Sequence, residues 1–144
     1  MIKTFRGQIK SSAEDSIVLH TNTGHMGYRI TKFEVMPATP GAASYEYVVK
    51  IYKISQTTID GAVDFSDQEL LGTAFLQGNA TSDTVDHINI VFDQEIFNQD
   101  IYITNYDVDG DTEAVNYYIE LEQMKLDLNE NTVATLKDIR NNTQ

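Results

Sequence analysis

Residues 105–122 read NYDVDGDTEAVNYYIELE, and the second half of this stretch decides the fold class. From Val115 to Leu121 apolar or aromatic side chains occupy every other position, with Asn116, Tyr118 and Glu120 between them. Successive side chains of a β-strand point to opposite faces of a sheet, so this alternation predicts a strand with one buried face. One polar face and one apolar face on the same strand is typical of antiparallel sheets.

The same two-residue period recurs along the chain. Clear examples are residues 45–54, 86–92 and 100–106, and weaker ones are residues 2–9, 16–21, 27–36 and 70–76. In residues 86–92 the pattern predicts that Ile88, Ile90 and Phe92 form the buried face. Within residues 27–36 the apolar phase changes between Ile30 and Phe33, which predicts a β-bulge at that point.

About eight strands, separated by turns rich in Gly, Pro, Asn, Asp and Ser, predict an all-β antiparallel β-sandwich, and this number of strands favours a jelly roll. Ser66 and Glu69 have the spacing of a capping box, which predicts a single helical turn. Near the C-terminus Val133, Leu136 and Ile139 share a helical face, so the pattern predicts a short terminal helix. We expect residues 1–140 to form a single domain and the polar residues 141–144 to fray.

Composition excludes several classes of function. The chain has 144 residues, no Cys and a formal net charge of −12 at pH 7. Without Cys there is no disulfide, no thiolate zinc site and no cysteine nucleophile. The strongly negative net charge disfavours binding to nucleic acid. The sequence contains no long apolar run, so we expect no signal peptide and no contact with a membrane. We therefore expect the chain to fold in a cytoplasm.

Charge is distributed unevenly along the chain. Residues 1–53 contain seven basic and four acidic residues, whereas no basic residue lies between Lys53 and Lys125. Such asymmetry could orient the docking of the protein on a partner. Alternatively, antiparallel pairing could place strands of the two halves side by side and blur the asymmetry.

The motif DVDGD, residues 107–111, raises the question of a calcium site. Three carboxylates at alternate positions could surround a hard cation. An EF-hand loop that begins at Asp107 requires glycine at its sixth position and an acid at its twelfth, where Thr112 and Tyr118 stand. A weak, exposed site of another kind stays open, and the alternative is an acidic β-hairpin tip. The candidate ligands are Asp107, Asp109, Asp111 and Glu113.

Other chemistry has weaker support. The histidines are His20, His25 and His87, and no third zinc ligand is indicated for the first two. The sequence contains no nucleophile elbow and no phosphate-binding glycine loop, so we expect neither a catalytic residue nor a cofactor.

Two groups of side chains could act in binding or catalysis. Glu120 and Glu122 share a face of one strand, a spacing that a glycosidase could use but that any polar strand face also produces. Four tyrosines could form an aromatic contact patch, although burial in the second sheet is the alternative. These are Tyr28, Tyr102, Tyr106 and Tyr118.

Several stretches together resemble the small β-rich structural proteins of the virions of tailed bacteriophages of marine bacteria. They are TFRGQI, GYRITKFEVMPATPG, VVKIYK, FDQEIFNQDIYIT, NYYIELEQMKLD and TVATLKDIR, which extend over most of the chain. The resemblance implies a non-enzymatic head decoration or cement protein, located in the virion and bound to the major capsid protein or other virion proteins. It implies no particular functional residues.

Two further expectations accompany this resemblance. By analogy of shape we expect a homo-oligomer, with a trimer as the first guess. The alternative function, in a different class, is a receptor-binding or glycan-binding module of the tail, neck or fibre, with the tyrosines as contact residues. A hydrolase that uses the carboxylates ranks last.

Overall fold

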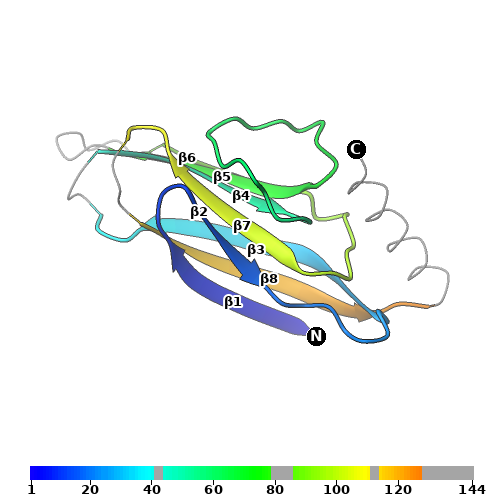
Figure 1. The fold of residues 1–144 in the computed structure, drawn as a ribbon. Helices are drawn as coiled ribbons and strands as arrows, with labels where there is room; N and C mark the ends of the chain where they lie inside the picture. The colour runs from blue at the N-terminus through cyan, green and yellow to red at the C-terminus, as the bar shows by residue number, and fades with distance from the viewer. Residues whose placement is uncertain (41–43, 79–85, 111–113, 128–144) are drawn as a thin grey trace.

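The computed structural model describes residues 1–40, 44–78, 86–110 and 114–127, and all its regular elements are strands (Figure 1). The predicted terminal helix over Val133, Leu136 and Ile139 and the predicted frayed tail lie outside these residues. The strands are β1 (Ile2–Ile9), β2 (Ala13–Ile17), β3 (Met26–Pro37), β4 (Tyr45–Tyr52), β5 (Leu70–Gly78), β6 (Asp86–Val91), β7 (Ile101–Asp107) and β8 (Val115–Lys125).

The eight strands form two antiparallel sheets that pack face to face as a sandwich (Figure 1). The three-stranded sheet has the order β1-β8-β3, and the five-stranded sheet has the order β2-β7-β4-β5-β6. Consecutive strands often lie in different sheets, so most of the fold depends on long-range pairing. The predicted all-β antiparallel sandwich is confirmed.

The core lies between the two sheets and is built by the alternation read from the sequence. Val115, Ile119 and Leu121 of β8 and Ile101 and Ile103 of β7 are each fully buried. Each strand sends every second side chain inward, so apolar residues from both sheets meet in one layer. Large fully buried side chains that complete this layer are Tyr47, Phe33, Phe97, Ile30, Ile51, Leu71 and Val49.

The predicted bulge in β3 is confirmed. The register between β3 and β8 shifts between Ile30 and Lys32, where Thr31 is the extra residue. Ile30 and Phe33, which are three residues apart, therefore both face the core and are almost fully buried. A bulge is the ordinary way for a strand to keep two apolar positions of opposite parity on one face.

The prediction for residues 16–21 was wrong in its bounds, because β2 spans Ala13–Ile17. The strand begins after Ser12, which has φ of 59° and donates its N–H to the Asn105 carbonyl. It ends where the N–H groups of Leu19 and His20 turn to the Asp100 carboxylate. The Asp100 carboxylate thus accepts N–H groups that, in a longer strand, would have bonded to the backbone of a neighbouring strand.

The buried face predicted for residues 86–92 was also wrong. Ile88 is 57% exposed and Ile90 is 37% exposed, and Asn89 instead donates from its side-chain amide to the Phe33 carbonyl of the other sheet. The period of two was correct, but the face that turns inward was the opposite one. Periodicity alone gives the alternation and leaves open which set of side chains is buried.

The helical turn predicted from Ser66 and Glu69 was wrong, because the structure has two successive turns there. Asp64 accepts the N–H of Ser66, and Asp67 accepts the N–H of Glu69. The backbone bonds Asp67 N–H to Asp64 carbonyl and Leu70 N–H to Asp67 carbonyl close the turns. Aspartate side chains thus cap this segment in place of Ser66.

Candidate functional site

The DVDGD motif forms a connection between the two sheets, because β7 belongs to the five-stranded sheet and β8 to the three-stranded sheet. The prediction of a hairpin tip was therefore wrong. Gly110 has φ of +86° and donates its N–H to the Asp107 carbonyl. Glycine adopts this left-handed conformation without strain, which explains its place in the motif.

Asp107 is only 3% exposed, and one of its carboxylate oxygens accepts hydrogen bonds from the backbone. Oδ1 accepts N–H groups from Glu46 and Asp109, each at 3.1 Å. Asp109 is exposed, while Asp111 and Glu113 lie outside the described residues. The described part of the chain contains no group of three or more metal-binding side chains. Calcium binding by this loop remains a prediction, with Asp107 engaged in turn formation.

The three histidines make separate contacts. His20 Nδ1 lies 2.7 Å from Asp100 Oδ1, an oxygen that also accepts the N–H groups of Leu19 and His20. Burial acts to raise the pKa of Asp100, but these hydrogen bonds outweigh it and hold the pKa below its ordinary value. This cluster fastens the β2–β3 connection to the segment that precedes β7. His25 accepts the Leu126 N–H at its carbonyl, and His87 lies on β6.

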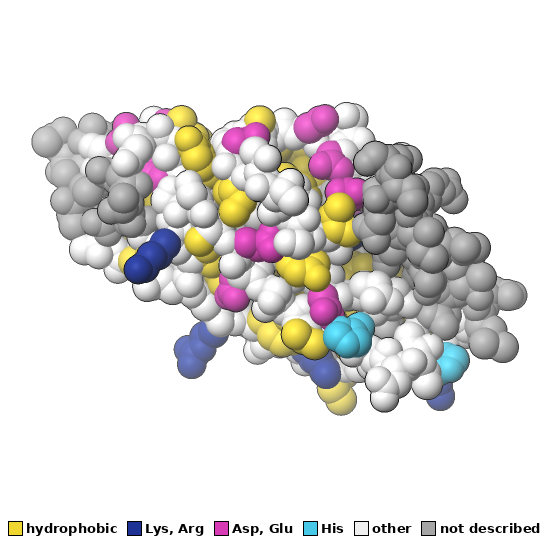
Figure 2. Space-filling view, viewed as in Figure 1, with side chains coloured by type: hydrophobic (Ala, Val, Ile, Leu, Met, Phe, Trp, Pro, Cys, Tyr) yellow, Lys and Arg dark blue, Asp and Glu magenta, His cyan; other side chains and the backbone are white. Residues whose placement is uncertain are grey.

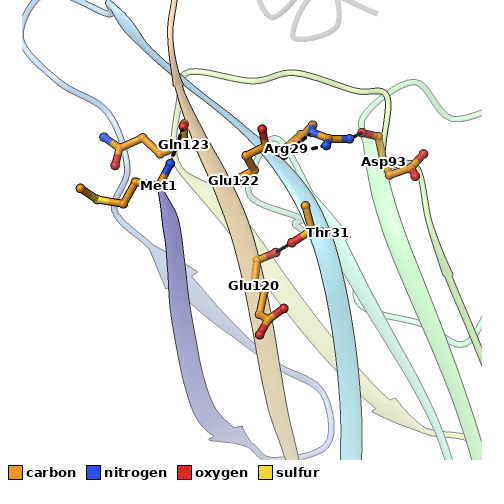
Figure 3. Close-up of polar contacts among 7 residues, drawn as sticks. All are labelled: Met1, Arg29, Thr31, Asp93, Glu120, Glu122 and Gln123. Carbon is orange, nitrogen blue, oxygen red and sulfur yellow. Dashed lines mark hydrogen bonds and ion pairs between the residues drawn. The ribbon is translucent and has the colours of Figure 1, made fainter.

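Glu120 and Glu122 both project from the outer face of β8, as predicted, but each has its own partner (Figure 3). Glu122 Oε2 receives Arg29 Nε at 3.0 Å and Nη2 at 2.6 Å. Glu120 accepts the Tyr118 hydroxyl at 2.8 Å, and its carbonyl accepts the Thr31 hydroxyl. The Glu122 carboxylate is thus held by Arg29 of β3, and the Glu120 carboxylate by Tyr118 of its own strand.

The four tyrosines do not form one patch. Tyr28 is buried and stacks on Phe97, with ring centroids 6.2 Å apart. Tyr102 and Tyr106 lie on β7 in the five-stranded sheet, and Tyr118 lies on β8 in the other sheet. The hypothesis of a shared aromatic contact surface was therefore wrong.

In the described part of the chain no segment lies over the outer face of the three-stranded sheet, and we call this the open face (Figure 1). It comprises the outward side chains of β1, β8 and β3, with Ile2 and Met36 more than half exposed. A shallow hollow of about 590 Å³ lies on this face. Its polar lining includes Arg6, Gln8, Glu34, Asn116 and Tyr118, and Gln8 donates to the Asn116 side chain at 3.0 Å.

The open face is balanced in charge. Strands β1 and β3 come from the basic part of the sequence, and β8 from the acidic part lies between them. Arg29 opposes Glu122 and Lys32 opposes Glu120 in register, while Lys32 Nζ lies 5.9 Å from the centre of the Tyr118 ring. In this sheet antiparallel pairing interleaves the two halves of the chain, which is the alternative the sequence left open.

The five-stranded side of the molecule is acidic. Figure 2 shows acidic side chains spread over that side, whereas most visible Lys and Arg side chains project from the margin where the three-stranded sheet lies. The basic residues described in β2, β4, β5, β6, β7 and the connections 53–69 and 93–100 are Lys50 and Lys53, both buried. The acidic ones are Glu14, Asp15, Glu46, Asp60, Asp64, Asp67, Glu69, Asp86, Asp93, Glu95, Asp100 and Asp107.

Residues 53–69, which we call the strap, arch over the outer face of the five-stranded sheet (Figure 1). Lys50 of β4 points outward beneath the strap, with its side chain 4% exposed, and donates to Asp60 at 3.2 Å and to the Ala62 carbonyl at 2.6 Å. Lys53 pairs with Glu95 at 3.4 Å. Glu14 of β2 holds the strap through Ser55 and Gln56.

These fastening residues were not recognised from the sequence. Lys50 occupies an ordinary polar position in an alternating strand, so the pattern assigned it to solvent. The available signal was the length of the segment between the strands predicted at residues 45–54 and 70–76, because long loops without regular structure inside a domain commonly cover a surface. Nothing in the pattern says which lysine such a loop will bury.

A second structural contact that was missed joins the two sheets. Tyr117 of β8 donates its hydroxyl to Asp15 of β2 at 2.6 Å. Burial, together with the hydrogen bond and the negative charge of Asp15, raises the pKa of Tyr117 well above its ordinary value. This contact closes the sandwich at the edge formed by β1 and β2.

Comparison with known proteins leaves the chain without an assigned family. No family model matches it, and no curated protein matches it. Among the described residues, no helix has the length and apolar character needed to cross a membrane.

Proposed function

We propose that the chain is a non-enzymatic structural protein of a bacteriophage virion, a decoration or cement protein that binds the outer surface of the head and stabilises the capsid lattice. The observation that carries the proposal is the contrast between the charge-balanced open face and the strongly acidic opposite side. The resemblance of the six quoted stretches to virion structural proteins supports the same role.

The open face suits attachment for an electrostatic reason. The cores of protein interfaces are depleted in charged residues, because desolvating an unpaired charge is costly. On this face Arg29 already neutralises Glu122, and Ile2, Met36 and Tyr118 offer apolar and aromatic contact area. Attachment by this face leaves the acidic side in solvent, where its net charge opposes nonspecific aggregation.

The partner in this proposal is the major capsid protein or another protein of the virion. A single contact through one small face would be weak, but the repeating lattice multiplies it when the subunits are linked. We therefore retain the expectation of a homo-oligomer, with a trimer as the starting hypothesis. Assembly in the host cytoplasm and final location in the virion belong to the same proposal.

The finer fold assignment is a jelly roll. In a jelly roll the first strand pairs with the last, the second with the second to last, and so on inward. Here β1 pairs with β8, β2 with β7 and β4 with β5. The remaining pair would join β3 to the region of β6, and a bridge between Tyr28 and Phe97, just after β6, lies at that place. Jelly rolls are common among capsid proteins, although one fold serves many functions.

Quantitative mass spectrometry of purified virions tests the proposal. A copy number comparable with that of the major capsid protein is expected, because a decoration protein repeats with the lattice. Particles that lack the protein should also lose their contents at a lower temperature than complete particles. Absence of the protein from virions, or presence in only a few copies, would contradict the decoration role.

The hollow on the open face favours a second candidate, a glycan-binding module of the tail, neck or fibre. Gln8, Asn116 and Arg6 supply amide and guanidinium groups beside the Tyr118 ring, a combination that can hydrogen-bond and stack on a sugar. A glycan array would support this candidate if one sugar class bound and Tyr118→Ala abolished that binding. A low copy number in the virion would point the same way.

A further inference from the structure

Strand β6 forms one edge of the five-stranded sheet. It pairs with β5 on one side, and within the described ranges no strand pairs with its other side. An unpaired edge presents backbone donors and acceptors to solvent and is a template for another strand. The inward side chain of Asn89 contacts the Phe33 carbonyl of β3, but the outward side of β6 faces the acidic side of the molecule. Occupation of this edge by a partner is therefore independent of the proposed function.

The register shows which backbone groups are available. Phe92 donates its N–H to the Leu71 carbonyl, and Gly72 lies opposite Val91. Hydrogen-bonded positions alternate along an antiparallel pair, so the even-numbered residues of β6 bond to β5. The N–H and carbonyl groups of His87, Asn89 and Val91 therefore point towards the free edge.

Apolar side chains line the same edge on the outer face of the sheet. Ile88 and Ile90 are exposed there, and Ile88 lies opposite the partly buried Phe75 of β5. A strand of this composition is expected to bury its isoleucines, but β6 turns them outward. An added strand would cover both isoleucines and pair the free backbone groups in one step.

The two ends of this edge are acidic. Asp86 lies at its start, and a hollow of about 390 Å³ follows its end, lined by apolar rings and by Asp67 and Asp93. Phe65 and Phe92 meet edge to face in this hollow, with ring centroids 5.4 Å apart. A segment that matches this edge therefore has apolar side chains in its middle and a positive charge at each end.

We propose that β6 binds an extended segment of another protein, with apolar residues at alternate positions and a basic residue at each end. Apolar side chains of the added strand pack beside Ile88 and Ile90, and its basic ends lie near Asp86 and near Asp93 and Asp67. A second copy of this chain fits less well, because antiparallel pairing of two β6 strands would bring the acidic ends of two strongly negative molecules together.

Titration of the full-length protein with the peptide Lys-Thr-Val-Thr-Val-Thr-Lys, followed by NMR, tests the inference, because its Lys and Val side chains share one face as Asp86, Ile88 and Ile90 do. We expect shifts and hydrogen-exchange protection at the amides of His87, Asn89 and Val91. The charge-reversed peptide Glu-Thr-Val-Thr-Val-Thr-Glu should bind about tenfold more weakly. Equal binding of the two peptides, or no protection at those amides, would overturn the proposal.

A matched pair of proline variants tests the edge itself. His87→Pro removes a free-edge N–H and leaves the bonds to β5 in place, so peptide binding should be lost. The bond from the Gln123 N–H to the Met1 carbonyl shows that odd-numbered residues of β1 bond to β8, so the Thr4 N–H points to the free edge of β1. Thr4→Pro removes this equivalent N–H, and peptide binding should persist. Circular dichroism verifies that both variants fold.

The opposite outcomes are equally informative. Unchanged binding by a folded His87→Pro variant would overturn the assignment to this edge. Concentration-dependent protection of the same three amides without peptide would show that a second copy occupies the edge, which would overturn the proposed occupant.

Discussion

The two outer faces of the sandwich carry the same kinds of residue in different environments. On the open face Lys32 lies in solvent above Tyr118, whereas on the strapped face Lys50 lies above Tyr52 and is covered by residues 53–69. Both lysines occupy polar positions of alternating strands. The difference shows that the covering loop, and not the strand pattern, decides whether a lysine holds the fold together or remains available to a partner.

Replacing Lys50 should produce the largest contrast between the faces. Lys50→Met keeps the side-chain length but removes the hydrogen bonds to Asp60 and the Ala62 carbonyl, so unfolding free energy should fall by about 2 kcal/mol. Lys32→Met removes only an exposed contact with Tyr118 and should cost about 0.5 kcal/mol. Urea denaturation measures both. Equal losses would break the distinction between a strapped and an open face.

Tyr117 and Tyr118 are neighbours that point to opposite faces, so they form a second matched pair. Tyr117→Phe removes the inter-sheet hydrogen bond to Asp15 and should lower the unfolding free energy by about 1.5 kcal/mol. Tyr118→Phe removes a hydrogen bond on the solvent side and should leave stability nearly unchanged. Thermal and urea unfolding measure the stability of both variants. A larger loss of stability in Tyr118→Phe than in Tyr117→Phe would contradict this account.

The contribution of Tyr117 to stability should depend on pH in the alkaline range. The pKa of Tyr117 is raised in the folded protein, so above about pH 10 the unfolded state loses a proton that the folded state keeps. Stability from this residue is therefore complete below about pH 10 and declines as pH rises further, by at most about 1.4 kcal/mol per pH unit. The Tyr117→Phe variant should show a shallower decline than wild type. An unchanged alkaline slope would contradict the assignment.

The Arg29 ion pair on the open face should contribute much less to stability than Lys50 or Tyr117. Its ion pair with Glu122 is partly exposed, and exposed pairs contribute little because water and salt screen them. Arg29→Ala should therefore lower the unfolding free energy by about 0.5 kcal/mol at low salt, and by less at about 1 M salt. Urea unfolding at the two salt concentrations measures the difference. A large, salt-independent loss would mean that Arg29 has a structural role that the open face does not predict.

Much of the fold could be predicted from the sequence, because local periodicity reports strands directly. The alternation of Val115, Tyr117, Ile119 and Leu121 and the phase change in β3 both correspond to observed features. Strand partners could not be predicted, since β7 and β8 are consecutive yet lie in different sheets. The wrong buried face of β6 has the same origin: an edge strand can turn either set of side chains inward, according to what lies across from it.

Less of the candidate site could be predicted. The charge asymmetry was visible, but its meaning depended on β8 lying between β1 and β3. The Tyr117–Asp15 bond joins residues 102 positions apart, and the strap contacts of Lys50 depend on the path of a loop. These features are properties of tertiary arrangement, which no short pattern encodes.

The central proposal is that the open face is the attachment face, and hydroxyl-radical oxidation of Met36 tests it most directly. Met36 is 58% exposed on this face, and Met26, partly buried at the start of the same strand, serves as the internal reference. In purified particles that contain the protein, Met36 should be oxidised several-fold more slowly than in the free protein, with Met26 unchanged. Equal oxidation of Met36 in both states would contradict attachment through the open face.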